Sequence, residues 1–219
     1  MSALIPVEAH LASLVIEAAN HLGLEVKIRE ISLTPVEGEF LSISTVRSET
    51  DQLVTYPLVS HSYHRERLIS FPFQEGSEVA ENSQRFVNEQ IKRLGLYGPN
   101  TFIFKRSGEL ISIQEGVGEA ALWSNLFSIT SVFENALRAA YKLPLGVSEQ
   151  IQSNWIMARF DAPLNLEMQS PYLHLFAHEP RYRIRKLTSH SGYVALSNIL
   201  NLKSEVIHAI DYLEGVINE

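Results

Sequence analysis

The chain has 219 residues and no cysteine, with 45% apolar residues, 20% charged residues and a formal net charge of −7. This length and composition predict a soluble globular protein whose core needs no disulfide. The acidic balance argues against a nucleic-acid binder, because such proteins present a basic face to phosphates. The missing cysteine excludes disulfides, thiolate metal ligands and a cysteine nucleophile.

The N-terminal segment lacks the pattern of a secretion signal, because Glu8, His10 and Glu17 interrupt it. No apolar run in the chain approaches the roughly 20 residues that span a bilayer. We therefore expect a cytoplasmic protein with neither a membrane nor a nucleic acid as partner.

The first third of the chain predicts one helix followed by strands. Apolar residues at positions 7, 11, 14, 15, 18 and 22 form one helical stripe, and Gly23 supplies a C-terminal stop. Three strand-like runs follow at residues 26–33, 39–46 and 52–59. They predict a small antiparallel meander.

The middle of the chain predicts two helices around a hairpin. Residues 77–94 have acidic side chains in the first turn and basic ones in the last, as helices favour. Residues 101–105 and 109–114 read as strands joined by a turn at Gly108. Ser131 and Glu134 form a capping-box pattern that opens a helix running to about Tyr141.

After residue 146 the pattern changes to short strands at 155–160, 172–176, 182–187 and 193–196, closed by an amphipathic helix at 204–216. We divide the chain into an N-terminal helix (1–25), a central unit (26–147) and a small β-rich C-terminal domain with a terminal helix (148–219).

The segment 131–146, which reads S-V-F-E-N-A-L-R-A-A-Y-K-L-P-L-G, carries a family resemblance. It resembles S-Q-F-E-x-H-L-R-A-x-x-x-L-P-L-G, the motif that closes the catalytic core of 5-(carboxyamino)imidazole ribonucleotide synthase, an ATP-grasp enzyme. Four weaker pieces occur in the same order. They are 29–32 (K-E-L-S in the family), 56–59 with 64–69 (Y-P-x-x-E-N-x-H-x-x-G-I-L), 108–115 (G-x-L-L-V-N-E), and 172–176 with 185–186 (H-L-H-x-Y-G-K and R-K-M-G-H).

The resemblance implies an α+β fold. We expect the second half of an ATP-grasp core, as an antiparallel sheet with the 77–94 and 131–141 helices on one face, followed by the β-rich C-terminal domain. The family joins bicarbonate to the amine of aminoimidazole ribonucleotide, using ATP and magnesium. ATP and Mg²⁺ are therefore the cofactors that the resemblance implies.

The resemblance also assigns site residues. Arg185 and Lys186 match the pair that grips the 5′-phosphate of the imidazole ribonucleotide, and His178 takes the place of a family lysine. Glu115 matches the second magnesium carboxylate, while the first falls on Thr101 or Phe102, which offer no charge. Each residue also has a plainer interpretation: a solvated basic strand, a surface histidine, or an acid at the end of a hairpin.

Other family features are missing from the sequence. The loop that touches the imidazole nucleotide becomes residues 116–123, without its arginine and both histidines. The 29 residues before Glu30 are too few for the family's nucleotide-fold and lid domains, and no glycine-rich phosphate loop occurs. His61, His64 and His174 are expected to be structural, since no third metal ligand accompanies the first two.

Three hypotheses follow. The chain is a catalytically impaired relative that binds a phosphorylated metabolite or a partner. Alternatively, it is half of a split or truncated ATP-dependent carboxylate-amine ligase, completed by another chain that supplies the missing domains. The protein partner that we expect is such a chain or, in a homodimer, a second copy of this one. The third is a non-enzymatic interaction protein.

Overall fold

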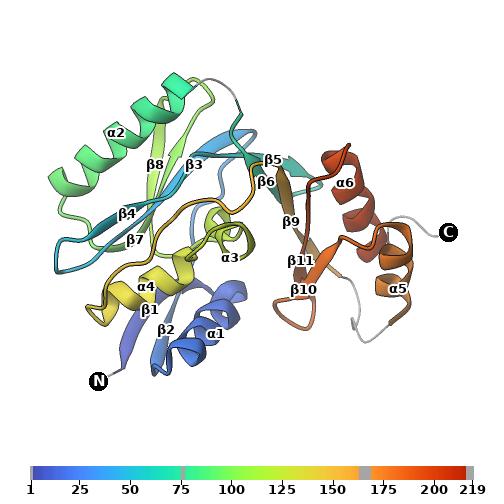
Figure 1. The fold of residues 1–219 in the computed structure, drawn as a ribbon, viewed down its shortest axis with the longest axis horizontal. Helices are drawn as coiled ribbons and strands as arrows, with labels where there is room; N and C mark the ends of the chain where they lie inside the picture. Colours follow the sequence, from blue (N-terminus) through green and yellow to red (C-terminus); the bar gives the residue numbers. More distant parts are fainter. Residues whose placement is uncertain (1, 75–76, 163–168, 216–219) are drawn as a thin grey trace.

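The computed structural model describes residues 2–74, 77–162 and 169–215 (Figure 1). Its main element is one sheet of nine strands, in the order β10-β11-β9-β6-β5-β3-β7-β8, with β4 paired to β3. Every pair in this sheet is antiparallel. The strands are β3 (Phe40–Arg47), β4 (Leu53–Thr55), β5 (Val59–His64), β6 (Arg67–Pro72), β7 (Gly98–Phe104), β8 (Leu110–Glu115), β9 (Trp155–Asp161), β10 (Arg183–Lys186) and β11 (Ser191–Ser197).

The N-terminal segment differs from the predicted helix. Residues Ala3–Glu8 form strand β1, the short 3-10 helix η1 covers Ala9–Leu11, and helix α1 spans only Ala12–Leu22. Strand β2 (Val26–Ile31) runs parallel to β1 in a separate two-stranded sheet, so the predicted antiparallel meander is wrong for this run. Ile5 and Val7 are buried while their neighbours are not, which is the period-two signal of a strand.

Gly23 does end α1, in the left-handed conformation (φ 67°) that favours glycine. The predicted strand 52–59 is divided between β4 and β5. The 101–114 hairpin is confirmed as the β7–β8 pair. Ser131 caps α4 (Val132–Ala140) by accepting a hydrogen bond from the Glu134 amide, and the Glu134 side chain pairs with Arg138 instead of completing the capping box.

The two central helices lie on opposite faces of the sheet, not on one face. Helix α2 (Ser77–Arg93) packs Val87 and Ile91 against Leu41 and Ile43 of β3. Helix α4 belongs to the cluster that contains Val46, which points the other way because side chains alternate along a strand. We call the two sides the α2 face and the α4 face.

The C-terminal segment continues the same sheet. Strand β9 pairs with β6, matching Ile69 with Ala158. Helices α5 (Gln169–His178) and α6 (Leu202–Leu213) pack in a cluster with Ile69, so they lie on the α2 face. The predicted strand 172–176 is therefore wrong. Pro171 lies in the first turn of α5, where its missing N–H removes no hydrogen bond of the helix. The division of the chain into domains remains a prediction.

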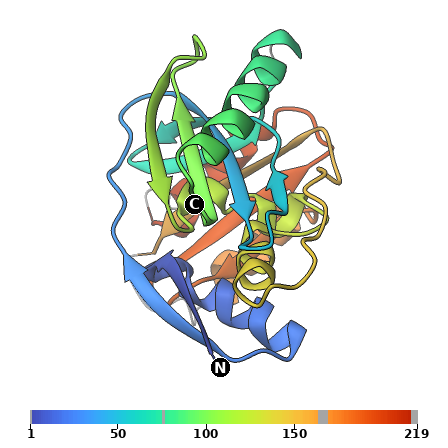
Figure 2. The ribbon, with the colours of Figure 1, turned by 90° about the vertical axis from the view of Figure 1, so that its left-hand side faces the viewer.

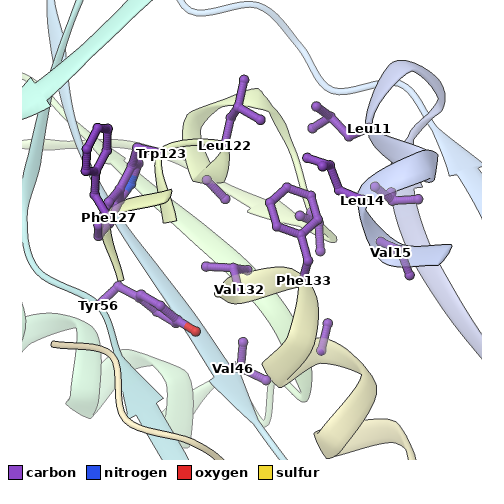
Figure 3. Packing of buried hydrophobic residues seen from close by; sticks show 14 of the residues in the cluster. Leu11, Leu14, Val15, Val46, Tyr56, Leu122, Trp123, Phe127, Val132 and Phe133 are labelled. Carbon is purple, nitrogen blue, oxygen red and sulfur yellow. The ribbon is translucent and has the colours of Figure 1, made fainter. Parts of the chain in front are cut away.

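The largest apolar cluster joins the β1–α1–β2 unit to the α4 face (Figures 1 and 2). Figure 3 shows Leu14 and Val15 of α1 directed toward Phe133 of α4. Nearby, Trp155 stacks between Trp123 and Phe127, with ring centroids 5.3 and 4.7 Å away. Apolar packing of this kind is the main stabilising force of the fold. No helix in the described part of the chain is long and apolar enough to cross a membrane.

We predict that Leu14→Ala lowers the free energy of unfolding by about 2–5 kcal/mol, because it leaves a cavity between α1 and α4. Ile16→Ala on the same helix is the matched control. Ile16 is 45% exposed whereas Leu14 is 1% exposed, so the control should cost less than about 1 kcal/mol. Urea unfolding of both variants measures the difference. Equal losses would show that α1 is not docked as described.

Candidate ligand-binding face

The α4 face carries a row of polar side chains from three adjacent strands. Arg185 of β10 is paired in register with Tyr193 of β11, and Tyr193 is paired with Arg159 of β9. Residues paired in register point to the same face. Tyr193 belongs to the cluster packed on α4 and α1, which identifies the face.

Arg185 is already engaged on this face. One of its terminal nitrogens donates to the Glu17 carboxylate on α1. The neighbouring Tyr193 hydroxyl accepts a hydrogen bond of 3.2 Å from the Asn125 amide. The Arg185 side chain is thus held against the β1–α1–β2 unit. The Glu17 carboxylate occupies the position on Arg185 where an anionic ligand would bind.

The structure does not bring the three predicted phosphate ligands together. Lys186 follows Arg185 along β10, so its side chain points to the α2 face. His178 lies at the end of α5, also on the α2 side, where its Nε2 is 3.2 Å from Glu205 Oε2. Of the three, only Arg185 lies on the polar row of the α4 face.

Arg159 is the centre of a network of charges beside this row. Its guanidinium bonds Asp161 Oδ2 at 2.5 Å and lies 3.5 Å from Glu119 Oε2. Arg67 of β6 bridges Asp161 (3.3 Å) and Glu214 (2.6 Å). The two arginines are therefore fixed by carboxylates on three sides.

Glu119 and Glu8 meet at the rim of a cavity of about 190 Å³. Glu119 opens the 3-10 helix η2 (Glu119–Ala121), and its amide donates to Glu8 Oε2 at 2.7 Å. Gly118 makes this approach possible. A Cβ at that position would come within 2.3 Å of the Leu33 side chain and 3.2 Å of Glu8 Oε2. Tyr63 also lines the cavity, whose remaining wall is mostly apolar.

Burial perturbs the acids and bases of this region. It raises the pKa of the Glu119 carboxyl to about 7, which Arg159 opposes and Glu8 reinforces. Burial also raises the pKa of Glu8, against the hydrogen bond from the Glu119 amide. His10, whose Nε2 is buried without a hydrogen-bond partner among the described residues, has its pKa lowered to about 4 by burial and by Arg159. Such perturbed groups cluster at functional sites.

The predicted magnesium position does not fit a divalent cation. Thr101 is 2% exposed and its hydroxyl lies 3.2 Å from Ser44 Oγ. In the β7–β8 register Thr101 is paired with Gln114, whereas Glu115 is paired with Asn100. Glu115 therefore points away from Thr101. No group of three potential ligands among His, Asp and Glu occurs in the described part of the chain.

The histidines expected to be structural have protein partners. His61 is fully buried between Ser42 and Ser70, with its ring nitrogens 2.7 and 2.9 Å from their hydroxyls. His64 Nε2 lies 2.9 Å from Asp211 Oδ1. The ring of His174 stacks on Tyr212 with centroids 4.3 Å apart.

Comparisons with solved structures identify the fold. N5-carboxyaminoimidazole ribonucleotide synthetase from Thermus thermophilus matches with a TM-score of 0.61 and 19% identity, over 93% of this chain and 57% of that one. The Thermotoga maritima synthetase gives 0.64 and 15%, over 84% and 53%. Glycinamide-RNase-transformylase T from Mycobacterium tuberculosis gives 0.66 and 14%, over 83% and 52%. No family model and no curated protein matches the chain.

The chain thus has the α+β fold found in ATP-grasp synthetases, and it spans about half the length of these structures. The resemblance seen in the sequence is confirmed at the level of the fold. Of the five pieces, residues 29–32 lie outside the main sheet: residues 29–31 belong to β2 of the small parallel sheet, and the main sheet begins at β3.

Sequence reasoning missed the central residues of this face. Glu8 and Arg159 lie in segments interpreted as helix and core strand, and no local motif links them. Glu119 lies in the 116–123 loop, which was compared with the family motif only for its arginine and histidines. The pair Gly118-Glu119 was the available signal, because a glycine before a carboxylate permits close backbone approach.

We predict a pH-dependent stability difference between the wild type and Glu119→Gln. The folded protein keeps the Glu119 proton up to about pH 7, while the unfolded chain releases it near 4.5. The wild-type free energy of unfolding therefore falls as the pH rises through this window, by up to roughly 3 kcal/mol for a shift of this size. The glutamine variant lacks this contribution. Urea unfolding from pH 4.5 to 8 measures it, with exposed Glu89→Gln as control, and parallel curves for wild type and Glu119→Gln would contradict the assignment.

Proposed function

We propose that this protein is a metabolite-binding relative of the ATP-grasp ligases that has lost magnesium-dependent phosphoryl transfer. The register of the β7–β8 hairpin carries the proposal. Phosphoryl transfer depends on hard oxygen ligands that hold magnesium beside the phosphates. At the predicted position the chain offers the buried Thr101 hydroxyl and the Gln114 amide, with the Glu115 carboxylate turned away.

The proposed ligand is a phosphorylated small molecule with a nitrogen-bearing end. Arg185 is the proposed anchor for the phosphate, which would replace the exposed Glu17 carboxylate as its partner, because a guanidinium offers paired donors to such an oxyanion. Glu8 and Glu119 lie farther along the same face and suit hydrogen-bond donors or a cationic nitrogen. The three named solved structures are two N5-carboxyaminoimidazole ribonucleotide synthetases and a glycinamide-RNase-transformylase T, and the synthetase name favours an imidazole ribonucleotide as the ligand.

A second candidate is half of a split ligase, because the chain matches about half the length of those structures. A partner chain would then supply the remaining ATP-binding groups. The direct packing of α1 on α4 favours the first candidate, since it fills the space beside the sheet with Leu14, Val15 and Phe133. The cytoplasmic location remains a prediction.

We predict that aminoimidazole ribonucleotide or ribose 5-phosphate raises the melting temperature of the protein, by roughly 1–3 °C at ligand concentrations well above the Kd. Mg-ATP alone should shift it by less. Arg185→Ala should abolish the shift caused by the phosphate compounds. Lys186→Ala is the matched control, because its side chain points to the other face, and its shift should equal that of the wild type.

Three outcomes of the melting experiment would reject parts of this proposal. Equal losses in Arg185→Ala and Lys186→Ala would exclude the α4 face as the phosphate site. A clear Mg-ATP shift with turnover would favour a ligase. No shift with any phosphate compound, together with a stable complex in pull-down, would favour an interaction protein.

A further inference from the structure

A second cavity, of about 240 Å³, lies near the ends of β7 and β8, away from the Glu8–Glu119 pair. Strand β1 borders it on one side and helix α4 on another. Ala136, Ala139 and Ala140 present only methyl groups to it, although the same helix buries Phe133 and Leu137 elsewhere. The cavity remains open because no large side chain fills it. The three alanine methyl groups form an apolar part of its wall, which we call the floor.

One cation and one anion line this cavity without pairing. Arg29 of β2 and Glu115 at the end of β8 are both exposed, and neither forms an ion pair or hydrogen bond through its side chain with the described residues. The other charges of the wall are neutralised locally. Arg47 pairs with Asp51 at 2.6 Å, and Glu49 pairs with Lys142 at 2.8 Å.

Strand β1 holds the two unpaired charges apart. Arg29 is the register partner of Pro6 on one side of β1. On the other side, Val117 donates its amide to the Pro6 carbonyl at 2.9 Å, which places Glu115 two residues from that contact. At about 5 Å per strand spacing, the two backbones lie roughly 10 Å apart. Their side chains reach the cavity from opposite sides.

We propose that this cavity binds a small zwitterion, an α-amino acid with an apolar side chain. Arg29 holds its carboxylate, Glu115 holds its ammonium group, and the three alanines contact its side chain. The charge arrangement excludes the simpler ligand classes. Glu115 repels a free anion such as phosphate, Arg29 repels a lone cation, and one carboxylate is too few for a metal ion. This proposal does not rest on the phosphate site of the α4 face.

Both charges are exposed, so their contribution is modest and is screened by salt. Binding should therefore weaken as the ionic strength rises. The apolar floor adds a contribution that grows with the apolar area of the ligand side chain.

Isothermal titration calorimetry with L-alanine, L-leucine and L-phenylalanine tests the proposal. N-acetyl-L-leucine lacks the ammonium group and L-leucinamide lacks the carboxylate, so both should bind about two- to fivefold more weakly than L-leucine at low ionic strength. Arg29→Gln and Glu115→Gln should each weaken L-leucine binding to a similar degree. Ala139→Leu should abolish it by filling the floor.

Lys27→Gln and Glu30→Gln are the matched controls, because they change exposed charges on the same strand as Arg29 and do not line the cavity. They should bind L-leucine as the wild type does, and so should Arg185→Ala. Melting curves of each variant confirm that it is folded. The proposal is overturned if none of the three amino acids binds, if the acetylated or amidated ligand binds as well as L-leucine, or if the controls weaken binding as much as Arg29→Gln.

Discussion

The alternation of side chains along one continuous antiparallel sheet is the constraint on which the rest of this structure depends. Because β6 pairs with β9, the central and C-terminal strands share two faces from β8 to β10. One face packs on α2, α5 and α6, and the other on α4 and the β1–α1–β2 unit. A shift of one residue in the register of any strand would move its side chains from one face of the sheet to the other.

The alternation also decides on which face of the sheet each charged side chain lies. It separates Arg185 from Lys186, and it pairs Thr101 with Gln114 while turning Glu115 toward a different cavity. It also aligns Arg185, Tyr193 and Arg159 in one row. The α4 face therefore carries a row of polar side chains, while the β7–β8 hairpin presents the neutral Thr101 and Gln114 together and directs Glu115 the other way.

Much of the fold could be predicted from local signals. The cap at Ser131, the stop at Gly23 and the β7–β8 hairpin depend on contacts a few residues apart. The errors arose where tertiary contacts decide, as in the pairing of β2 with β1, the placement of α2 and α4 on opposite faces, and two misassigned elements. The apolar stripe that begins at Val7 continues from strand β1 into α1, and α5 follows from burial of Leu175 beneath α6, which alternation of Leu173 and Leu175 concealed. The Glu8–Glu119–Arg159 site joins segments about 40 and 110 residues apart, and single-sequence spacing carries no information about such contacts.

The most direct test of the central claim is a manganese titration followed by water-proton relaxation, with Mn²⁺ as a paramagnetic substitute for magnesium, in the presence and absence of ATP. If Thr101 and Gln114 face one way and Glu115 the other, the protein adds no Mn²⁺ binding to that of ATP alone. Glu115→Gln then leaves the titration unchanged. A tight ternary complex of protein, Mn²⁺ and ATP that Glu115→Gln abolishes would contradict the account.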